Sequence, residues 1–156
     1  MFHDEERRIL IAADHLLAHI SSNPLMTRPV DGGERPRALV DYLDSLRRTR
    51  EMEVDLVLPG HGDPIADHRA LIDSRLALHR RRADKICGLN AEEPRTAYEL
   101  ARALWGDIAV TQAFLTLSEV VGHADILIEE GRVREVERDG VVRFEAVDRT
   151  YHRRDG

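Results

Sequence analysis

Residues 56–64 have the sequence Leu-Val-Leu-Pro-Gly-His-Gly-Asp-Pro, an apolar segment followed by a turn that contains a histidine. The apolar run that begins at Val54 predicts a buried strand, and the Pro-Gly pair ends that strand abruptly. Glycine on both sides of His61 lets the backbone turn sharply and approach other groups closely. The stretch therefore predicts a histidine at the carboxyl end of a strand, where α/β folds place ligands and catalytic groups.

A second strand with a polar end lies earlier in the chain. Residues 7–13 form a near-continuous apolar run after a charged start, which predicts a buried strand ending at Asp14. Residues 37–50 carry leucines at helical spacing, so strand, helix and strand predict a βαβ-type layered unit. The Asp14 carboxylate and the His61 imidazole, brought together at strand ends, are suitable ligands for Zn²⁺ or a similar divalent ion.

The sequence changes character near residue 67, after which three helices are expected. Asp67 is expected to cap a long helix, and Thr96 opens a second helix with a capping box. A third helix is expected to begin at Thr111 and to stop at Gly131.

A hairpin is expected to follow the helices. Residues 132–138 and 141–147 alternate in polarity across the pair Asp139-Gly140, a strong hairpin signal. Three helices and a two-stranded hairpin occur in the order of a winged-helix domain. The sequence therefore predicts two regions, a partial α/β domain over residues 1–66 and a winged-helix-like domain over residues 67–156.

The motifs around Asp14 (Ile-Ala-Ala-Asp-His-Leu-Leu) and His61 (Leu-Val-Leu-Pro-Gly-His-Gly-Asp-Pro) resemble the last two metal-binding motifs of the metallo-β-lactamase superfamily. The likeness is to its glyoxalase II-like and β-lactamase-like branch. The long helix, a second helix with Leu-Trp-Gly at 104–106, the third helix and the hairpin resemble that branch's C-terminal winged-helix-like domain. This resemblance, over about residues 5–147, implies an α/β (α+β) chain: the C-terminal half of an αββα fold, then three helices and a β-hairpin.

The resemblance also implies a metal-dependent hydrolase. In the family, an aspartate at the place of Asp14 bridges two divalent metal ions, zinc among them, and a histidine at the place of His61 completes the second site. Water held there attacks an ester, thioester, lactam or phosphodiester bond. The loop over residues 21–33 is expected near the mouth of the site. Its possible substrate-loop residues are Ser21, Ser22 and Asn23.

The chain departs from the family in its ligands. The motif His-x-His-x-Asp-His and a later histidine are both absent among its eight histidines, and Ala13 replaces the usual glycine before Asp14. We therefore expect a C-terminal half that lacks the first sheet and most ligands, so that no catalytic site is complete. A catalytic zinc site needs about three protein ligands plus water. The chain alone is expected to retain no zinc at Asp14 and His61 and to show no substantial hydrolysis.

Other histidines are weaker candidates for a third ligand. His19 and His68 lie near the two loops and are conceivable ligands, whereas His15 should point away from Asp14 if the strand continues. His79 lies on the apolar face of the long helix and is expected to be a hydrogen-bonded core histidine rather than a ligand.

Two functions of other classes stay open. A winged-helix module would bind nucleic acid through its third helix. The outward face of that helix is expected to carry Gln112, Thr116, Glu119 and His123. Acidic neighbours and the lack of a basic stripe make this interpretation unfavourable. Alternatively, the chain is a non-catalytic interaction piece, whose exposed sheet edge recruits a separate N-terminal half or a second copy.

Composition excludes several classes of protein. The chain has 156 residues, 42% of them hydrophobic and 33% charged, which fits a globular protein and not a disordered one. Its longest apolar run, residues 9–13, is too short to span a membrane, and no signal peptide is apparent. One cysteine excludes a Cys-based zinc site. A cytoplasmic location is expected.

Overall fold

The computed structural model describes residues 1–27, 29 and 31–147 of the chain. Two positions of the predicted loop, 28 and 30, and all residues from 148 onward, His152 among them, lie outside the described residues. The elements are β1 (Phe2–Asp4), β2 (Ile9–Ala13), α1 (Ala38–Arg50), β3 (Leu56–Pro59), α2 (His68–Glu92), α3 (Ala97–Trp105), α4 (Ile108–Thr111), α5 (Ala113–Glu129), β4 (Val133–Arg138) and β5 (Val141–Ala146).

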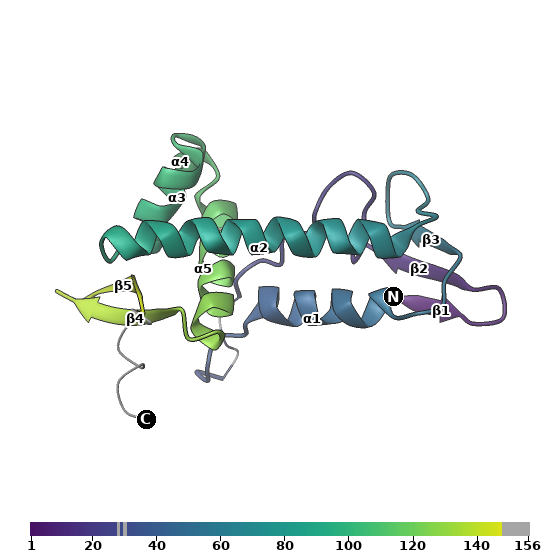
Figure 1. Ribbon diagram of the computed structural model, residues 1–156, viewed down its shortest axis with the longest axis horizontal. Helices are drawn as coiled ribbons and strands as arrows, with labels where there is room; N and C mark the ends of the chain where they lie inside the picture. The colour runs from purple at the N-terminus through teal and green to yellow at the C-terminus, as the bar shows by residue number, and fades with distance from the viewer. Residues whose placement is uncertain (28, 30, 148–156) are drawn as a thin grey trace, which may run out of the picture.

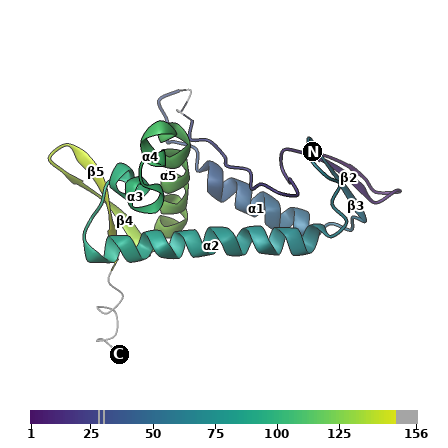
Figure 2. The ribbon, with the colours of Figure 1, turned by 90° about the horizontal axis from the view of Figure 1, so that it is seen from above.

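The long helix α2 runs the length of the molecule (Figure 1). A small sheet of β1, β2 and β3 lies at one end, and the β4–β5 hairpin lies at the other. Helix α1 lies beside one half of α2, while α3, α4 and α5 gather over the other half (Figure 2). No helix in the described part of the chain is long and apolar enough to cross a membrane.

The predicted βαβ unit is confirmed. β2 and β3 pair in parallel, with Leu10 opposite Val57, and α1 connects them. Strand β1 was not predicted from the sequence; it adds to β2 in the antiparallel sense. The first core cluster fills the space between this sheet and the helices α1 and α2. Its largest fully buried side chains are Leu10, Leu16, Leu46 and Ile72.

The prediction that the first strand is buried on both sides is wrong for one face. Leu10 and Ala12 face the core, but Ile11 is 50% exposed and pairs with Phe2, which is 66% exposed. The apolar run indicated a strand covered on both faces. Here α1 and α2 cover only one face, so the other face presents apolar side chains to solvent.

The second region follows the predicted order of elements. The Asp67 side chain accepts a hydrogen bond from the Ala70 N–H, and Thr96 forms the predicted capping box. Asp139 and Gly140 both have positive φ (55° and 73°), as the tight turn between two hairpin strands requires. A second core cluster packs α2, α3 and α5 against the hairpin. The boundary at residues 66 and 67 stays a prediction, since α2 is continuous alongside both clusters.

The third predicted helix differs from the expectation in two respects. It corresponds to α5, which begins at Ala113, and a short helix that was not predicted, α4, precedes it. Most of the face expected to point outward is also buried: Thr116 and Glu119 are each 7% and His123 is 0% exposed, while Gln112 is exposed as expected. Helix α5 packs against α1, α2, α3 and β4, which leaves little of it at the surface. Apolar residues on several sides of this segment indicate a buried helix, and that signal was missed.

Candidate metal centre

Asp14 and His61 meet at the ends of the two parallel strands. The Asp14 Oδ1 and His61 Nε2 atoms are 3.4 Å apart, and both side chains are exposed. The strand pairing causes this proximity, because Ala13 lies opposite Pro59 and the Gly60 N–H donates to the Ala13 carbonyl at 2.9 Å. The expectation that the two strand ends bring this carboxylate and this imidazole together holds in the structure.

Backbone geometry around this pair requires small residues. A Cβ at Gly60 would lie 2.7 Å from Asp14 Oδ1 and 3.2 Å from the Ala13 carbonyl carbon. Gly60 thus allows the second loop to approach the carboxylate. Ala13 has φ 47°, in the left-handed region that favours glycine. The glycine that the family usually has at this position would meet the same backbone requirement.

Further contacts fix the segment that follows Asp14. His19 Nε2 lies 2.8 Å from Asp63 Oδ2, which links this segment to the loop after His61. The Tyr42 hydroxyl donates to the carbonyl of His15 at 3.2 Å, and Arg75 donates to the carbonyls that follow. The strand-end loops are therefore held by side chains of α1 and α2.

The predicted substrate-loop residues lie in two places. Ser22 donates from its hydroxyl to the Asp14 carbonyl, which puts it beside the candidate centre. Ser21 Oγ instead lies 3.3 Å from His79 Nε2, and Asn23 donates to the carbonyl of Leu115 at 3.4 Å. The start of this loop thus runs from the strand end to α5, and a role in substrate binding stays a prediction.

The other candidate histidines do not join Asp14 and His61. His15 hydrogen-bonds Thr49 Oγ1 at 2.9 Å on the side of α1, and burial lowers its pKa. His68 is buried at the start of α2, where its Nε2 lacks a hydrogen-bond partner. Within the described residues, no third His, Cys, Asp or Glu completes a ligand group with Asp14 and His61. The pair therefore offers one carboxylate and one imidazole at the strand ends.

A different set of potential ligands lies inside the helical region. His79 of α2 and Glu119 and His123 of α5 are buried, and one ligand atom from each lies within 4.8 Å of the others. As predicted, His79 is a buried, hydrogen-bonded histidine: its Nδ1 lies 3.2 Å from His123 Nε2. Burial lowers the pKa of both histidines to about 4. His123 and Glu119 were assigned to an exposed face in the sequence analysis, so this cluster was not predicted.

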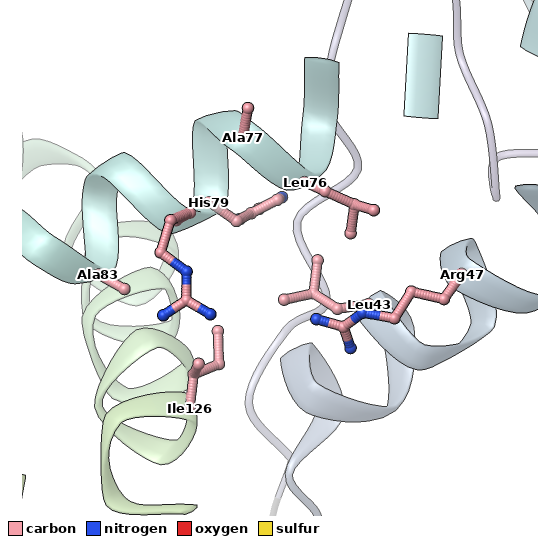
Figure 3. Close-up of a pocket in the computed structure, with 8 residues that line it drawn as sticks. Leu43, Arg47, Leu76, Ala77, His79, Ala83 and Ile126 are labelled. Atoms are coloured by element: carbon pink, nitrogen blue, oxygen red, sulfur yellow. The ribbon is translucent and has the colours of Figure 1, made fainter. Parts of the chain in front are cut away.

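His79 also lines a cavity of about 300 Å³ between α1, α2 and α5. Figure 3 shows Leu43, Leu76 and Ile126 facing into this space from the three helices. The lining is mostly aliphatic, and it adds no carboxylate or further imidazole. The polar side chains of its lining are His79, Arg47 and Arg80.

The chain is similar to a metallo-hydrolase in sequence and to two β-lactamase-type proteins in structure. No protein-family model matches the chain. The chain is 36% identical over 149 residues to a probable metallo-hydrolase, YqjP, of Bacillus subtilis (strain 168), across 96% of this chain and 46% of that protein. It is also similar to two crystal structures. For a β-lactamase domain protein from Burkholderia ambifaria the TM-score is 0.82 at 30% identity, and 93% of this chain and 43% of that chain are covered.

The other structure is a metallo-β-lactamase family protein from Thermus thermophilus. The TM-score is 0.76 at 29% identity, and 94% of this chain and 44% of that chain are covered. All three relatives thus match nearly the whole of this chain, which spans somewhat less than half the length of each.

Proposed function

We propose, from the confirmed resemblance of this chain to the metallo-β-lactamase superfamily, that it supplies the C-terminal part of a metal-dependent hydrolase. One observation carries the proposal: Asp14 and His61 approach to 3.4 Å at the ends of two parallel strands. The 46% coverage of the Bacillus subtilis relative supports the view that the remaining ligands belong to a part outside this chain.

The residues present fit a metal centre of this kind. Asp14 offers carboxylate oxygens and His61 an imidazole nitrogen, the ligand types that zinc accepts. The approach of Gly60 to the Asp14 carboxylate leaves no room for a Cβ, so the loop is shaped around this group. We propose zinc as the ion, with Asp14 and His61 as its ligands. When bound, the ion supplies Lewis acidity for attack by water on an ester, thioester, lactam or phosphodiester.

The isolated chain is proposed to be inactive. Two protein ligands hold zinc weakly, and a catalytic centre takes about three with a water. His19 and Asp63 pair with each other across the two loops, so neither is free to act as a further ligand without breaking this contact. The role of this chain is then to hold the Asp14 carboxylate and the His61 imidazole at one edge of the sheet.

The open face of the sheet supports the proposal of a missing half. Phe2 and Ile11 are exposed neighbours there, and exposed apolar faces mark surfaces that another layer covers. We propose that the N-terminal half of the hydrolase packs on this face. Association between copies of this chain is the alternative, and the sheet edge at β1 would be its contact.

The helical region is proposed to be a winged-helix-like domain that packs beside the hydrolase site. Ser21 and Asn23 connect the strand-end loop to α2 and α5, so this region borders the centre. Nucleic-acid binding is disfavoured, because Thr116, Glu119 and His123 of the expected groove-facing surface are buried.

The test joins this chain to the segment that precedes the matched region in the Bacillus subtilis relative. The joined protein, loaded with zinc, is assayed on ester, thioester, lactam and phosphodiester substrates. We expect hydrolysis of at least one class, and a loss of about 100-fold or more in kcat/KM with His61→Ala. A folded joined protein whose hydrolysis is unchanged by both His61→Ala and Asp14→Ala would contradict the proposal.

A further inference from the structure

The His79, Glu119 and His123 side chains form a cluster at the crossing of two helices. His79 projects from α2, while Glu119 and His123 lie one turn apart on α5. All three side chains are buried: His79 is 2%, Glu119 7% and His123 0% exposed. Buried groups of this kind are paired or coordinate a metal. This cluster shares no residue with the pair of Asp14 and His61.

The hydrogen bonds of His123 determine which of its ring nitrogens is free. Its Nδ1 lies 2.7 Å from the Glu119 backbone carbonyl, which can only accept, so Nδ1 carries the proton. The Nε2 lone pair therefore points at His79 Nδ1, 3.2 Å away. A backbone carbonyl that holds the second ring nitrogen is also the usual partner of a metal-ligating histidine.

We propose that His79 Nδ1, His123 Nε2 and the Glu119 carboxylate bind a divalent ion of the zinc class. In a tetrahedral site with Zn–N bonds of about 2.0–2.1 Å, two ligand nitrogens lie about 3.3 Å apart. The 3.2 Å between the two ring nitrogens fits this separation. The ligand set is two imidazoles and one carboxylate, with a position left for water. The proposal is independent of the proposed hydrolase function.

The direction of the hydrogen bond between Ser21 and His79 determines which ring nitrogen of His79 carries the proton. If His79 Nε2 donates to Ser21 Oγ, 3.3 Å away, then His79 Nδ1 is unprotonated and both facing nitrogens offer lone pairs. If the Ser21 hydroxyl donates instead, His79 Nδ1 donates to His123 Nε2 and the cluster is a hydrogen-bonded chain. In both states the two facing ring nitrogens are 3.2 Å apart, and an ion would turn the rings so that both lone pairs converge on it. The Glu119 carboxylate, now 3.8 Å from Nδ1 of His123, would move toward the same ion.

The charges around the cluster suit a cation. The lowered pKa values of His79 and His123 leave both rings neutral at neutral pH, and a metal binds the neutral form. Glu119 adds one negative charge, which Arg82 now neutralises through a direct ion pair. Arg82 also stacks over the Trp105 ring, so it is held at the edge of the cluster. An ion would share Glu119 with Arg82, and Arg82 therefore limits its affinity.

Cavities reach the cluster from two sides. The cavity of about 300 Å³ in Figure 3 is lined by His79. Another, of about 230 Å³, is lined by Arg82 and Glu119 together with Asn23. The second provides a path for a hydrated ion to the Glu119 carboxylate, which lies at its wall.

The test uses the full chain, stripped with a chelator and titrated with Zn²⁺ by calorimetry and with Co²⁺ by visible absorption. We expect one equivalent and a tetrahedral Co²⁺ spectrum. His123→Gln is expected to weaken Zn²⁺ binding by about 100-fold. Arg82→Gln is expected to strengthen it several-fold, because the competing cation is gone. Asp14→Ala and His61→Ala are the matched controls and should change the affinity by less than about 2-fold.

Two results would overturn the proposal. One is binding that His61→Ala abolishes and His123→Gln leaves intact, which would place the ion at the strand-end pair. The other is an absence of any zinc-dependent shift in the imidazole nitrogen resonances of His79 and His123 in the wild-type chain. That second measurement decides the matter even if His123→Gln does not fold. Failure of the joined hydrolase would leave both results unaffected.

Discussion

Ala13 adopts a backbone conformation that suits glycine better than alanine. Its φ of 47° lies in the left-handed region, which costs an L-residue with a Cβ about 1–2 kcal/mol. We predict that Ala13→Gly raises the free energy of unfolding by about 0.5–1 kcal/mol. This net gain is smaller than the strain relieved, because glycine has a larger conformational entropy in the unfolded state. Urea denaturation of the chain measures this. Ala12→Gly, at the buried neighbouring position, should destabilise, and an equal loss at both positions would contradict the interpretation.

Gly60 is the residue on which the shape of the candidate centre depends. Its hypothetical Cβ would lie within 2.7 Å of Asp14 Oδ1 and 3.2 Å of the Ala13 backbone, and the backbone cannot yield as a flexible side chain would. We predict that Gly60→Ala in the joined hydrolase lowers kcat/KM by about 10-fold or more through displacement of the Asp14 carboxylate. Gly88→Ala on α2, where nothing lies within 4 Å, is the control. Equal kinetics for both variants would refute this role.

At the scale of elements, the close packing of α1 on α5 depends on Gly122. A Cβ there would lie 2.8 Å from the Leu39 Cβ. We predict that Gly122→Ala lowers the free energy of unfolding by about 1–3 kcal/mol. Gly88→Ala is the matched control on α2, with no atom within 4 Å, and should stabilise by up to about 1 kcal/mol through helix propensity. Thermal or urea denaturation of both variants gives the comparison, and a stable Gly122→Ala chain would argue against this helix contact.

Local signals predicted most of the elements, and they failed where tertiary contacts decided. The capping box at Thr96 and the Asp139-Gly140 turn are short-range signals, and both are present in the structure. Strand β1 has only three residues, and it exists because β2 offers it an edge. His123 was assigned to solvent from helical periodicity, which cannot show that α5 is surrounded by α1, α2 and α3.

The Asp14 and His61 pair could be predicted from local sequence signals, whereas the buried cluster of His79, Glu119 and His123 could not. Asp14 and His61 each end a strand, so the pairing of β2 with β3 brings them together. His79 and His123 lie 44 positions apart on two helices, and no local pattern fixes how those helices cross. Only the packing of α2 on α5 puts their rings side by side.

At the scale of the whole molecule, the buried histidine pair makes stability depend on pH. His79 and His123 have pKa values of about 4 in the folded chain and about 6.5 when exposed by unfolding. Between these values the unfolded chain binds more protons, so stability is full above pH 6.5 and falls as the pH drops toward 4. We predict a loss on the order of 3 kcal/mol for each of the two histidines over that range in metal-free protein. Urea denaturation from pH 7.5 to 4 measures the loss.

Carboxylates protonate in part of the same range, so a variant is needed to isolate the histidines. His79→Gln should flatten the pH dependence between 6.5 and 4 relative to the wild-type chain. His19→Gln is the control, since His19 is exposed beside Asp63. If both variants keep the wild-type slope, the buried pair is not its source.

The chain has Asp14 and His61 side by side at two strand ends, an apolar sheet face open to solvent, and less than half the length of its relatives. The proposed function therefore depends on a second part of the protein that completes the metal centre. The most direct measurement is the zinc content of the desalted joined hydrolase, compared between wild type, Asp14→Ala and His61→Ala. We expect more zinc in the wild-type joined protein than the isolated chain holds, and a loss of that additional zinc in both variants. Equal zinc in all three folded proteins would contradict the assignment of Asp14 and His61 as ligands.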